Sequence, residues 1–411
     1  MLRLNADEAG LAAATKTLLS GGVVVIPTDT VYGLAAHPDF PDAVARLYTI
    51  KQREAAKPIA LLAADAAAAE RFLGGMDPVA RRVAERRWPG ALTLVLAVTA
   101  PRARTHRGTE AVTVPRCVLA RGDTTPTFEG LRVPDHDWTR RLLAACGGVL
   151  RVTSANLSGQ RAATEAEGAL KDVGLSADLV IDDGISPGGV ASTVAKIVDG
   201  RITVLRDGPV KFLTLASGSP RRAKILSQLG IDFTVVKTDA PEVAYADDPE
   251  RTVRENALAK GAVPRPSVPR CVLARGAGTQ ERLGDAAGED ALRYGILSAD
   301  TIVWHKGKIY GKPRDLDEAK QFLRELSGET HTVFTGVVYN GAAKVEKSFV
   351  TFESLTDAEI GAYVGRVKPT DRAGAYDIDE AGDWLIERYE GEYENIMGLP
   401  VGPLKEWGLC N

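Results

Sequence analysis

Two sets of short polar motifs occupy the two halves of this 411-residue chain, and they do not overlap. The first set starts with Pro-Thr-Asp-Thr-Val-Tyr-Gly-Leu at Pro27–Leu34, and the second starts with Ser-Gly-Ser-Pro-Arg-Arg at Ser217–Arg222. Each follows a short apolar run of the kind that forms a buried strand. Because one hydrophobic core rarely serves so long a chain, the sequence predicts two domains. We place them at residues 1–209 and 211–411.

Composition narrows the class of protein. An apolar share of 45% and a charged share of 26% are typical of a globular domain, and a net charge of −3 argues against a broad nucleic-acid-coating surface. The four cysteines form no Cys-x-x-Cys pair, which favours reduced thiols over disulfides. The first apolar run, Val23–Ile26, is too short to cross a membrane. We therefore expect a cytoplasmic protein without a membrane partner.

Helical and strand patterns alternate along both halves, which predicts α/β architecture with helices covering a sheet. The first half has helical patterns at 9–19, 42–51, 78–88 and 138–146, and strand patterns at 23–26, 93–98, 149–153, 179–181, 193–198 and 203–205. The second half restarts with a strand at 212–216 and a helix at 220–229, and we expect a later strand to end at Asp300 and Thr301.

The nonapeptide Val-Pro-Arg-Cys-Val-Leu-Ala-Arg-Gly occurs twice, at Val114–Gly122 and Val268–Gly276. Identical residues in two otherwise unlike domains do not come from shared structure. One interpretation is a DNA repeat inserted in frame at two tolerated surface loops. The other is a pair of basic loops that contact RNA or each other. We favour the first interpretation.

Residues that suit an anion site recur in the first half. Pro27–Leu34 places hydroxyls and a carboxylate at the carboxyl end of a strand, where α/β proteins bind ligands. Lys51, Arg53 and Lys57 then supply three cations close in sequence. Alone they would be read as a solvated helix face. Together with the small polar loop Ser154–Gly159 they suit a triphosphate and a carboxylate or bicarbonate.

These motifs, with Pro-Gly-Ala-Leu-Thr, Arg-Val-Pro-Asp-His, Ser-Thr-Val and Arg-Asp-Gly further along, resemble the YrdC/TsaC family of L-threonylcarbamoyladenylate synthases. The resemblance implies a twisted mixed α/β sheet. It also implies condensation of ATP, bicarbonate and L-threonine into threonylcarbamoyl-AMP and pyrophosphate, which serves the tRNA-modification machinery. Carried over by motif, the nucleotide phosphates would be held by Lys51, Arg53, Ser154, Asn156 and Arg206, the first two being catalytic. The threonine and carbonate side would be lined by Thr28, Thr30, Tyr32, Lys57 and Ser192, with Arg132 nearby.

The second half offers a different phosphate-binding arrangement. Ser-Gly-Ser-Pro-Arg-Arg follows a strand and opens a helix, whose amino-terminal amides and dipole attract an anion. Alone it could be an ordinary capped helix. Further along lie Glu242, Asp300 and several cations. They supply the two carboxylates and the positive charge that Mg²⁺-dependent attack of water on a phosphoanhydride requires.

This ordered set resembles the Maf family of nucleoside triphosphate pyrophosphatases, through Thr-Gly-Val, Asp-Arg-Ala-Gly-Ala-Tyr and Asn-Ile-Met-Gly-Leu-Pro as well. The resemblance implies a two-lobed Maf/ITPase-like α/β domain, a possible homodimer, and hydrolysis of nucleoside triphosphates to NMP and pyrophosphate. By the same resemblance, Asp300 and Lys260 would be catalytic, and Glu242 and Asp300 would hold Mg²⁺. The phosphates would be gripped by Ser217, Arg221, Arg222 and Lys312.

Both halves depart from the family patterns. Each contains an insertion that carries one copy of the repeat, and Asp379 stands where a Maf protein that prefers dTTP and UTP often has glutamine. Three interpretations follow. Both domains are enzymes, or the first is a non-catalytic RNA- or nucleotide-binding module, or the insertions have left one half as an interaction scaffold. We favour two active enzymes with a dTTP/UTP-like or modified nucleotide as the second substrate.

Overall fold

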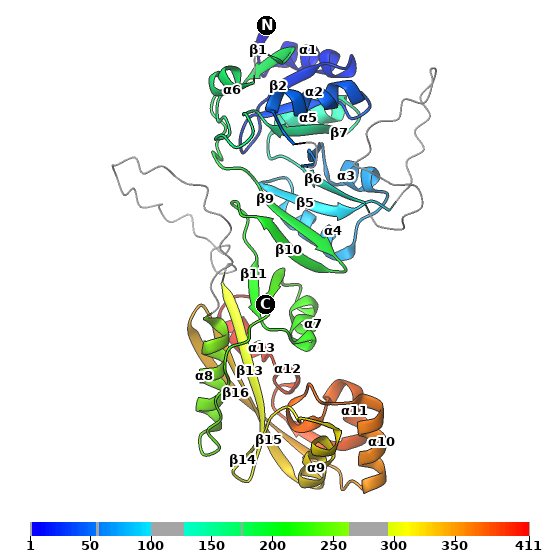
Figure 1. Ribbon diagram of the computed structural model, residues 1–411, viewed down its shortest axis with the longest axis vertical. Helices are drawn as coiled ribbons and strands as arrows, with labels where there is room; N and C mark the ends of the chain where they lie inside the picture. Colours follow the sequence, from blue (N-terminus) through cyan, green and yellow to red (C-terminus); the bar gives the residue numbers. More distant parts are fainter. Residues whose placement is uncertain (1, 55–56, 100–126, 174–175, 263–294, 411) are drawn as a thin grey trace, which may run out of the picture. The chain divides into compact units, whose positions relative to one another are not determined.

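The computed structural model describes residues 2–54, 57–99, 127–173, 176–262 and 295–410 (Figure 1). Both copies of the nonapeptide repeat lie outside these residues. The chain divides into two compact units, Met1–Lys211 and Phe212–Asn411. No helix in the described parts is long and apolar enough to span a membrane.

The first unit is built on a mixed sheet of parallel and antiparallel strands, as the sequence predicted. In the described residues the strands pair in the order β1 (Leu2–Asn5), β8 (Leu179–Asp182), β2 (Val23–Ile26), β3 (Gly33–Ala36), β7 (Val149–Ser154), β4 (Leu61–Ala63), β6 (Phe128–Arg132), β5 (Leu92–Ala97), β9 (Thr193–Val198) and β10 (Arg201–Arg206). The helices of this unit are α1 (Glu8–Leu19), α2 (Pro41–Lys51), α3 (Ala66–Leu73), α4 (Pro78–Arg87), α5 (Asp137–Ala145) and α6 (Ala166–Asp172).

Strand β2 explains how the sheet is covered. All four of its residues are fully buried, and successive side chains of a strand point to opposite faces. Val23 and Val25 pack with residues of α2 and α6, whereas Val24 and Ile26 pack with residues of α1 and α5. The continuous apolar run therefore reflects helices on both faces of the sheet.

The second unit contains a sheet in the order β12 (Phe233–Val236), β11 (Leu213–Ala216), β13 (Ile296–His305), β15 (Thr330–Tyr339), β16 (Ala342–Phe352) and β17 (Ile386–Glu390), with β14 (Lys308–Tyr310) paired to the far end of β13. Its helices are α7 (Pro220–Gln228), α8 (Pro249–Gly261), α9 (Leu316–Leu326), α10 (Asp357–Val367), the 3₁₀ turn η3 (Ala373–Ala375), α11 (Ile378–Leu385), α12 (Tyr393–Met397) and α13 (Val401–Glu406).

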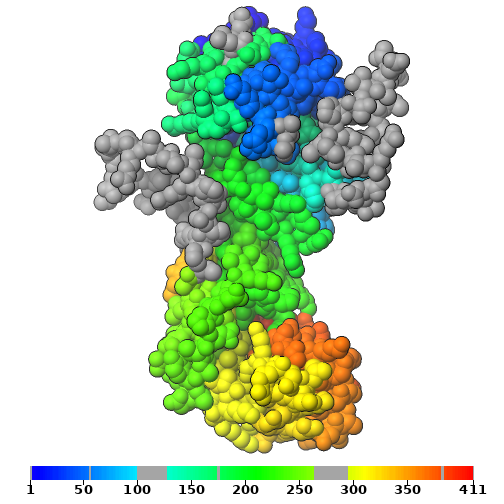
Figure 2. Space-filling model, viewed as in Figure 1, coloured from blue at the N-terminus to red at the C-terminus, as the bar shows by residue number. Residues whose placement is uncertain are grey.

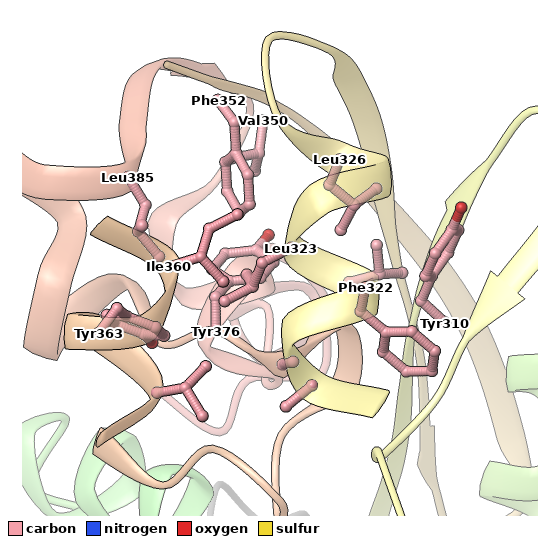
Figure 3. Packing of buried hydrophobic residues seen from close by; sticks show 14 of the residues in the cluster. Tyr310, Phe322, Leu323, Leu326, Val350, Phe352, Ile360, Tyr363, Tyr376 and Leu385 are labelled. Atoms are coloured by element: carbon pink, nitrogen blue, oxygen red, sulfur yellow. The ribbon is translucent and has the colours of Figure 1, made fainter. Parts of the chain in front are cut away.

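Two hydrophobic clusters make this unit two-lobed. One joins β11, the start of β13 and the end of β15 to α7 and α13. The other joins the last part of β13, the first part of β15 and the end of β16 to α9, α10 and η3. Phe322, Phe352 and Tyr376 are among its aromatic residues (Figure 3). Figure 1 shows α7 and α13 at one end of these strands and α9, α10 and α11 at the other. The polar site described below lies between the two clusters.

The expectation that a strand ends at Asp300 and Thr301 is wrong. Strand β13 continues to His305 and stays paired with β15 throughout, with Asp300 opposite Gly336 and Thr301 opposite Thr335. Polar residues are tolerated in the middle of this strand because each has a partner. The Thr301 and Thr335 hydroxyl oxygens lie 3.0 Å apart, and Asp300 accepts hydrogen bonds from two residues of α8.

The glycine opposite Asp300 lets α8 approach the sheet. A Cβ atom on Gly336 would lie 2.3 Å from the carbonyl oxygen of Val253 in α8. We predict that Gly336→Ala destabilises the second unit by about 1–3 kcal/mol, as overpacking does, measured by urea denaturation with hydrogen exchange in β13 and β15. The control is Gly361→Ala in α10, where a Cβ would contact nothing and should stabilise by at most about 1 kcal/mol. Equal stability of the two variants would contradict this packing.

Candidate functional sites

The loop between β2 and β3 presents hydroxyl groups held by an arginine. The Thr28 hydroxyl oxygen lies 3.1 Å from that of Thr30 and donates to the Val31 carbonyl. Arg132, the last residue of β6, donates to the Thr30 hydroxyl at 2.7 Å and to the Asp29 carboxylate. Thr28, Thr30 and Arg132 are all buried. The loop is therefore held in place by hydrogen bonds within the unit.

Tyr32 from the same motif has a supporting position. Its ring is fully buried, and its hydroxyl donates to the Gly184 carbonyl at 2.8 Å and accepts from the Asp183 amide at 2.9 Å. Burial raises the pKa of the Tyr32 phenol to about 12. Since both hydrogen bonds are internal, Tyr32 anchors the turn that follows β8.

Lys51 is the last residue of α2 and is also fully buried. Its ammonium group donates to the Asn156 carbonyl at 2.7 Å, to the Asn156 amide oxygen at 3.1 Å and to the Ser154 carbonyl. The Asn156 amide nitrogen in turn donates to the Leu157 and Gln160 carbonyls. Burial lowers the pKa of Lys51 to about 8, and the charge of Arg53 acts in the same direction. Lys51 thus holds the Ser-Ala-Asn loop in place.

Three guanidinium groups gather in this unit, and we call Arg53, Arg132 and Arg206 the arginine cluster. Arg206 donates to the Ser192 carbonyl at 2.8 Å, and Ser192 is itself held by Thr93. Burial lowers the pKa of Arg206, and the charges of Arg132 and Arg53 lower it further. Groups that repel one another in this way favour binding of an anion between them.

Arg53 and Lys57, which follow Lys51 in the sequence, lie closer to the surface of the unit. The Arg53 guanidinium donates to the Lys57 carbonyl at 2.9 Å and to the Pro58 carbonyl at 3.1 Å. The Lys57 side chain is exposed and pairs with Glu54 at 3.2 Å. Arg53 therefore remains partly exposed on an ordered turn, whereas the Lys57 charge is shared with a carboxylate.

The second unit contains a cavity of about 410 Å³. It is bounded by the start of α7, the segment before α8, the middle of β13, and the loops before α9 and α11. The cavity brings together the second-half residues that the sequence predicted for catalysis, metal binding or phosphate binding, namely Ser217, Arg221, Arg222, Glu242, Lys260, Asp300 and Lys312.

A lysine joins two carboxylates in this cavity. The Lys260 ammonium lies 2.7 Å from Glu242 Oε1 and 2.5 Å from Asp300 Oδ1. Asp300 is buried, whereas the Glu242 side chain is 55% exposed. Partial burial raises the pKa of Glu242, but the hydrogen bond and charge of Lys260 outweigh this effect and hold it below its usual value. We call these three residues the carboxylate–lysine triad.

The Ser-Gly-Ser-Pro-Arg-Arg motif is supported from behind by Arg222. This buried guanidinium donates to the Ser217 hydroxyl at 3.0 Å, the Gly398 carbonyl at 2.8 Å and the Thr301 hydroxyl at 3.1 Å. Burial lowers its pKa to about 10, although the charge of Asp300 opposes the shift. The N-cap residue Ser219 makes no side-chain cap, so the first amides of α7 are available to an anion.

The structure adds cavity residues that sequence reasoning missed. Buried Asp377 accepts from Arg372 at 2.8 Å and lies 3.4 Å from an Arg221 nitrogen. Both Arg372 and Asp377 line the cavity. Asp379, two residues on, instead pairs with Lys224 at 2.5 Å and accepts from Tyr393. The motif around Arg372 was visible in the sequence, but its ion-pair partners were not.

The Ser-Ala-Asn loop provides a test of the role of Lys51. Lys51→Met should leave the two Asn156 acceptors without their donor, since the Ser154 carbonyl still accepts from the Asn156 amide. We expect it to destabilise the first unit by about 2–3 kcal/mol, measured by chemical denaturation with hydrogen exchange in β7. Lys57→Met is the matched control, because the exposed Lys57 side chain supports no buried group. A Lys51→Met protein as stable as the control would show that the loop does not depend on this ammonium group.

Comparisons with known proteins agree with this division of the chain. Residues 16–208 match the Sua5/YciO/YrdC family, described as "Telomere recombination", and residues 212–407 match the family described as "Maf-like protein". The dTTP/UTP pyrophosphatase of Desulfitobacterium hafniense is 39% identical over 49% of this chain and 88% of that protein. The enzyme of the same name from Acetivibrio thermocellus is 38% identical over 47% of this chain and 92% of its own length.

Among solved structures, P. abyssi Sua5 complexed with L-threonine is 25% identical with a TM-score of 0.45, covering 59% of this chain. The chain spans only about two thirds of that protein, 66%. From its motifs, the two family models and the Maf relatives, the chain belongs to the Maf family over residues 212–407 and carries a Sua5/YciO/YrdC domain ahead of it, so it is a fusion of the two.

Proposed function

We propose that the chain is a bifunctional enzyme that works on phosphoanhydrides at two separate sites. The first unit condenses ATP, bicarbonate and L-threonine into threonylcarbamoyl-AMP and pyrophosphate, the activated group being passed to the tRNA-modification machinery. The second unit hydrolyses nucleoside triphosphates to NMP and pyrophosphate. The carboxylate–lysine triad in a cavity lined by cations is the observation that carries the second activity.

In the second unit the cations hold the triphosphate and the triad directs water. Arg221, Lys312 and the first amides of α7 line one cavity and can neutralise the phosphate oxygens. The buried carboxylate of Asp300 can accept a proton from the attacking water as the α–β phosphoanhydride breaks. The products are then NMP and pyrophosphate, which leaves with the electron pair of the broken bond.

The donor set of this site suits Mg²⁺. The described residues contain no cluster of three or more carboxylate, histidine or cysteine ligands. Of the carboxylates that line the cavity, Glu242 and Asp300 are brought together by Lys260. Mg²⁺ commonly binds through one or two carboxylates together with substrate phosphates. Bound there, it would neutralise charge that develops on the phosphate oxygens.

We propose dTTP and UTP as the preferred substrates of this unit. Similar proteins over the Maf region carry the name dTTP/UTP pyrophosphatase. The replacement at Asp379 does not argue against this preference, because the Asp379 carboxylate is engaged by Lys224 and Tyr393. The cavity also has apolar lining from Val333, Ile396 and Met397, which suits a nucleobase.

In the first unit, catalysis would come from positioning and charge neutralisation. The arginine cluster can hold the ATP phosphates, while the buried hydroxyls of Thr28 and Thr30 lie beside Arg132, where a carboxylate or carbonate could be bound. Lys51 contributes by fixing the Ser-Ala-Asn loop. No covalent intermediate with the protein is needed.

Asp300→Asn tests the second activity. It keeps the shape of the side chain but removes its charge and basicity, so hydrolysis of dTTP should fall by about a hundredfold or more. Nucleotide binding, measured by calorimetry, should persist because the cations remain. Asp317→Asn, at a side chain that is 91% exposed, is the control and should hydrolyse dTTP like the wild type. Undiminished turnover in Asp300→Asn, or dTDP as the sole product, would overturn the proposal.

Arg53→Ala tests the first activity. Removing one member of the arginine cluster should lower formation of threonylcarbamoyl-AMP by about a hundredfold, followed by mass spectrometry. Arg46→Ala on the same stretch of chain is the matched control, since Arg46 forms an exposed ion pair with Asp178 that contributes little. Full synthase activity in Arg53→Ala would exclude this site.

A further inference from the structure

Asn256 in α8 connects the two segments that carry Glu242 and Asp300. Its side chain is buried, with 3% exposure. The amide oxygen accepts from the Val243 backbone amide at 2.8 Å, and the amide nitrogen donates to the Val243 carbonyl at 3.0 Å. The same nitrogen donates to Asp300 Oδ2 at 2.9 Å. One side chain therefore binds both backbone groups of Val243 and the carboxylate of Asp300.

This arrangement controls where Glu242 lies. Glu242 directly precedes Val243, so fixing the backbone of Val243 also fixes the origin of the Glu242 side chain. Helix α8, which carries Asn256, packs against β13, which carries Asp300; in Figure 2 the light-green surface around α8 adjoins the yellow surface of later residues. Asn256 thus ties the segment that carries Glu242 to the strand that carries Asp300.

Asparagine is suited to this position for a chemical reason. The contacts need one acceptor and two donor hydrogens on a short planar group, which the asparagine amide supplies. Aspartate would lose both donors and place a second negative charge against Asp300. Lys260 also joins the carboxylates, but through a flexible side chain whose ammonium group can shift when phosphates enter.

We propose that Asn256 is a positioning residue of the second unit, which sets the spacing of Glu242 and Asp300 for a divalent cation. This inference rests on the proposed pyrophosphatase function. Partners that orient metal ligands from behind typically change metal affinity or activity by about 10–100-fold when they are removed.

Thr252, one turn earlier in α8, provides a matched control. Its buried hydroxyl oxygen accepts from the Tyr245 backbone amide at 2.8 Å and donates to the Tyr245 carbonyl at 3.2 Å. Thr252 therefore ties the same segment to the same helix, but its hydrogen bonds do not reach Asp300. Thr252→Val keeps the shape of the side chain and removes this tie together with the hydroxyl contact to the Asp248 carbonyl at 3.1 Å.

The test compares the full-length wild type with Asn256→Ala, Asn256→Asp and Thr252→Val. Binding of Mn²⁺ is followed by electron paramagnetic resonance without nucleotide, and kcat and KM for dTTP are measured separately. We expect Asn256→Ala to weaken Mn²⁺ binding and lower kcat by about 10–100-fold each, with KM nearly unchanged. Asn256→Asp should also lower kcat, because aspartate lacks the donor hydrogens that reach the Val243 carbonyl and Asp300. Thr252→Val should bind Mn²⁺ and turn over like the wild type, with all variants folded by circular dichroism.

Two outcomes would overturn the inference. Either Thr252→Val loses Mn²⁺ affinity as much as Asn256→Ala does, so that any loosening of the segment is sufficient, or Asn256→Ala behaves like the wild type. Absence of triphosphate hydrolysis by the wild type would instead refute the proposed function, while the Mn²⁺ comparison would still decide the role of Asn256.

Discussion

The second unit depends on compensation of a buried negative charge. Asp300 lies in the middle of a strand, with its side chain 7% exposed, where an unpaired carboxylate would be costly. Lys260 offsets that charge directly and also pairs with Glu242. Asn256 donates a hydrogen bond to the other carboxylate oxygen of Asp300. Because Gly336 lets α8 come close, the compensating groups reach Asp300 from one helix. The close packing of α8 on the sheet is therefore what brings these charged and polar groups of the cavity together.

In the first unit the buried charge that must be stabilised is positive. Among the described residues of this unit the buried cations are Lys51 and Arg132, and of these only Arg132 pairs with a carboxylate. Lys51 is held by two backbone carbonyls and an amide oxygen, and the more exposed Arg206 is held by the carbonyl of Ser192. Uncharged acceptors satisfy the hydrogen bonds and leave the positive charge in place. A unit built in this way is ready for an anionic ligand without a change of fold.

Much of the fold could be predicted from the sequence because local signals were strong. The run Val23–Ile26 indicated a strand buried on both faces, and Pro220 near the start of α7 marked a helix beginning. Asp300 was misplaced at a strand end because its partners, Asn256 and Lys260, lie on a helix far away in sequence. The sequence likewise indicated Lys51 and Tyr32 as site residues. It did not indicate their internal hydrogen bonds, because these depend on loops that only folding brings together.

The central claim is that one chain carries two independent sites for phosphoanhydride chemistry. It is tested most directly by a ³¹P NMR time course of the wild-type protein with dTTP, ATP, bicarbonate and L-threonine in one sample. We expect dTMP and threonylcarbamoyl-AMP to accumulate together with pyrophosphate. Accumulation of orthophosphate with dTDP and ADP, without either monophosphate product, would contradict it.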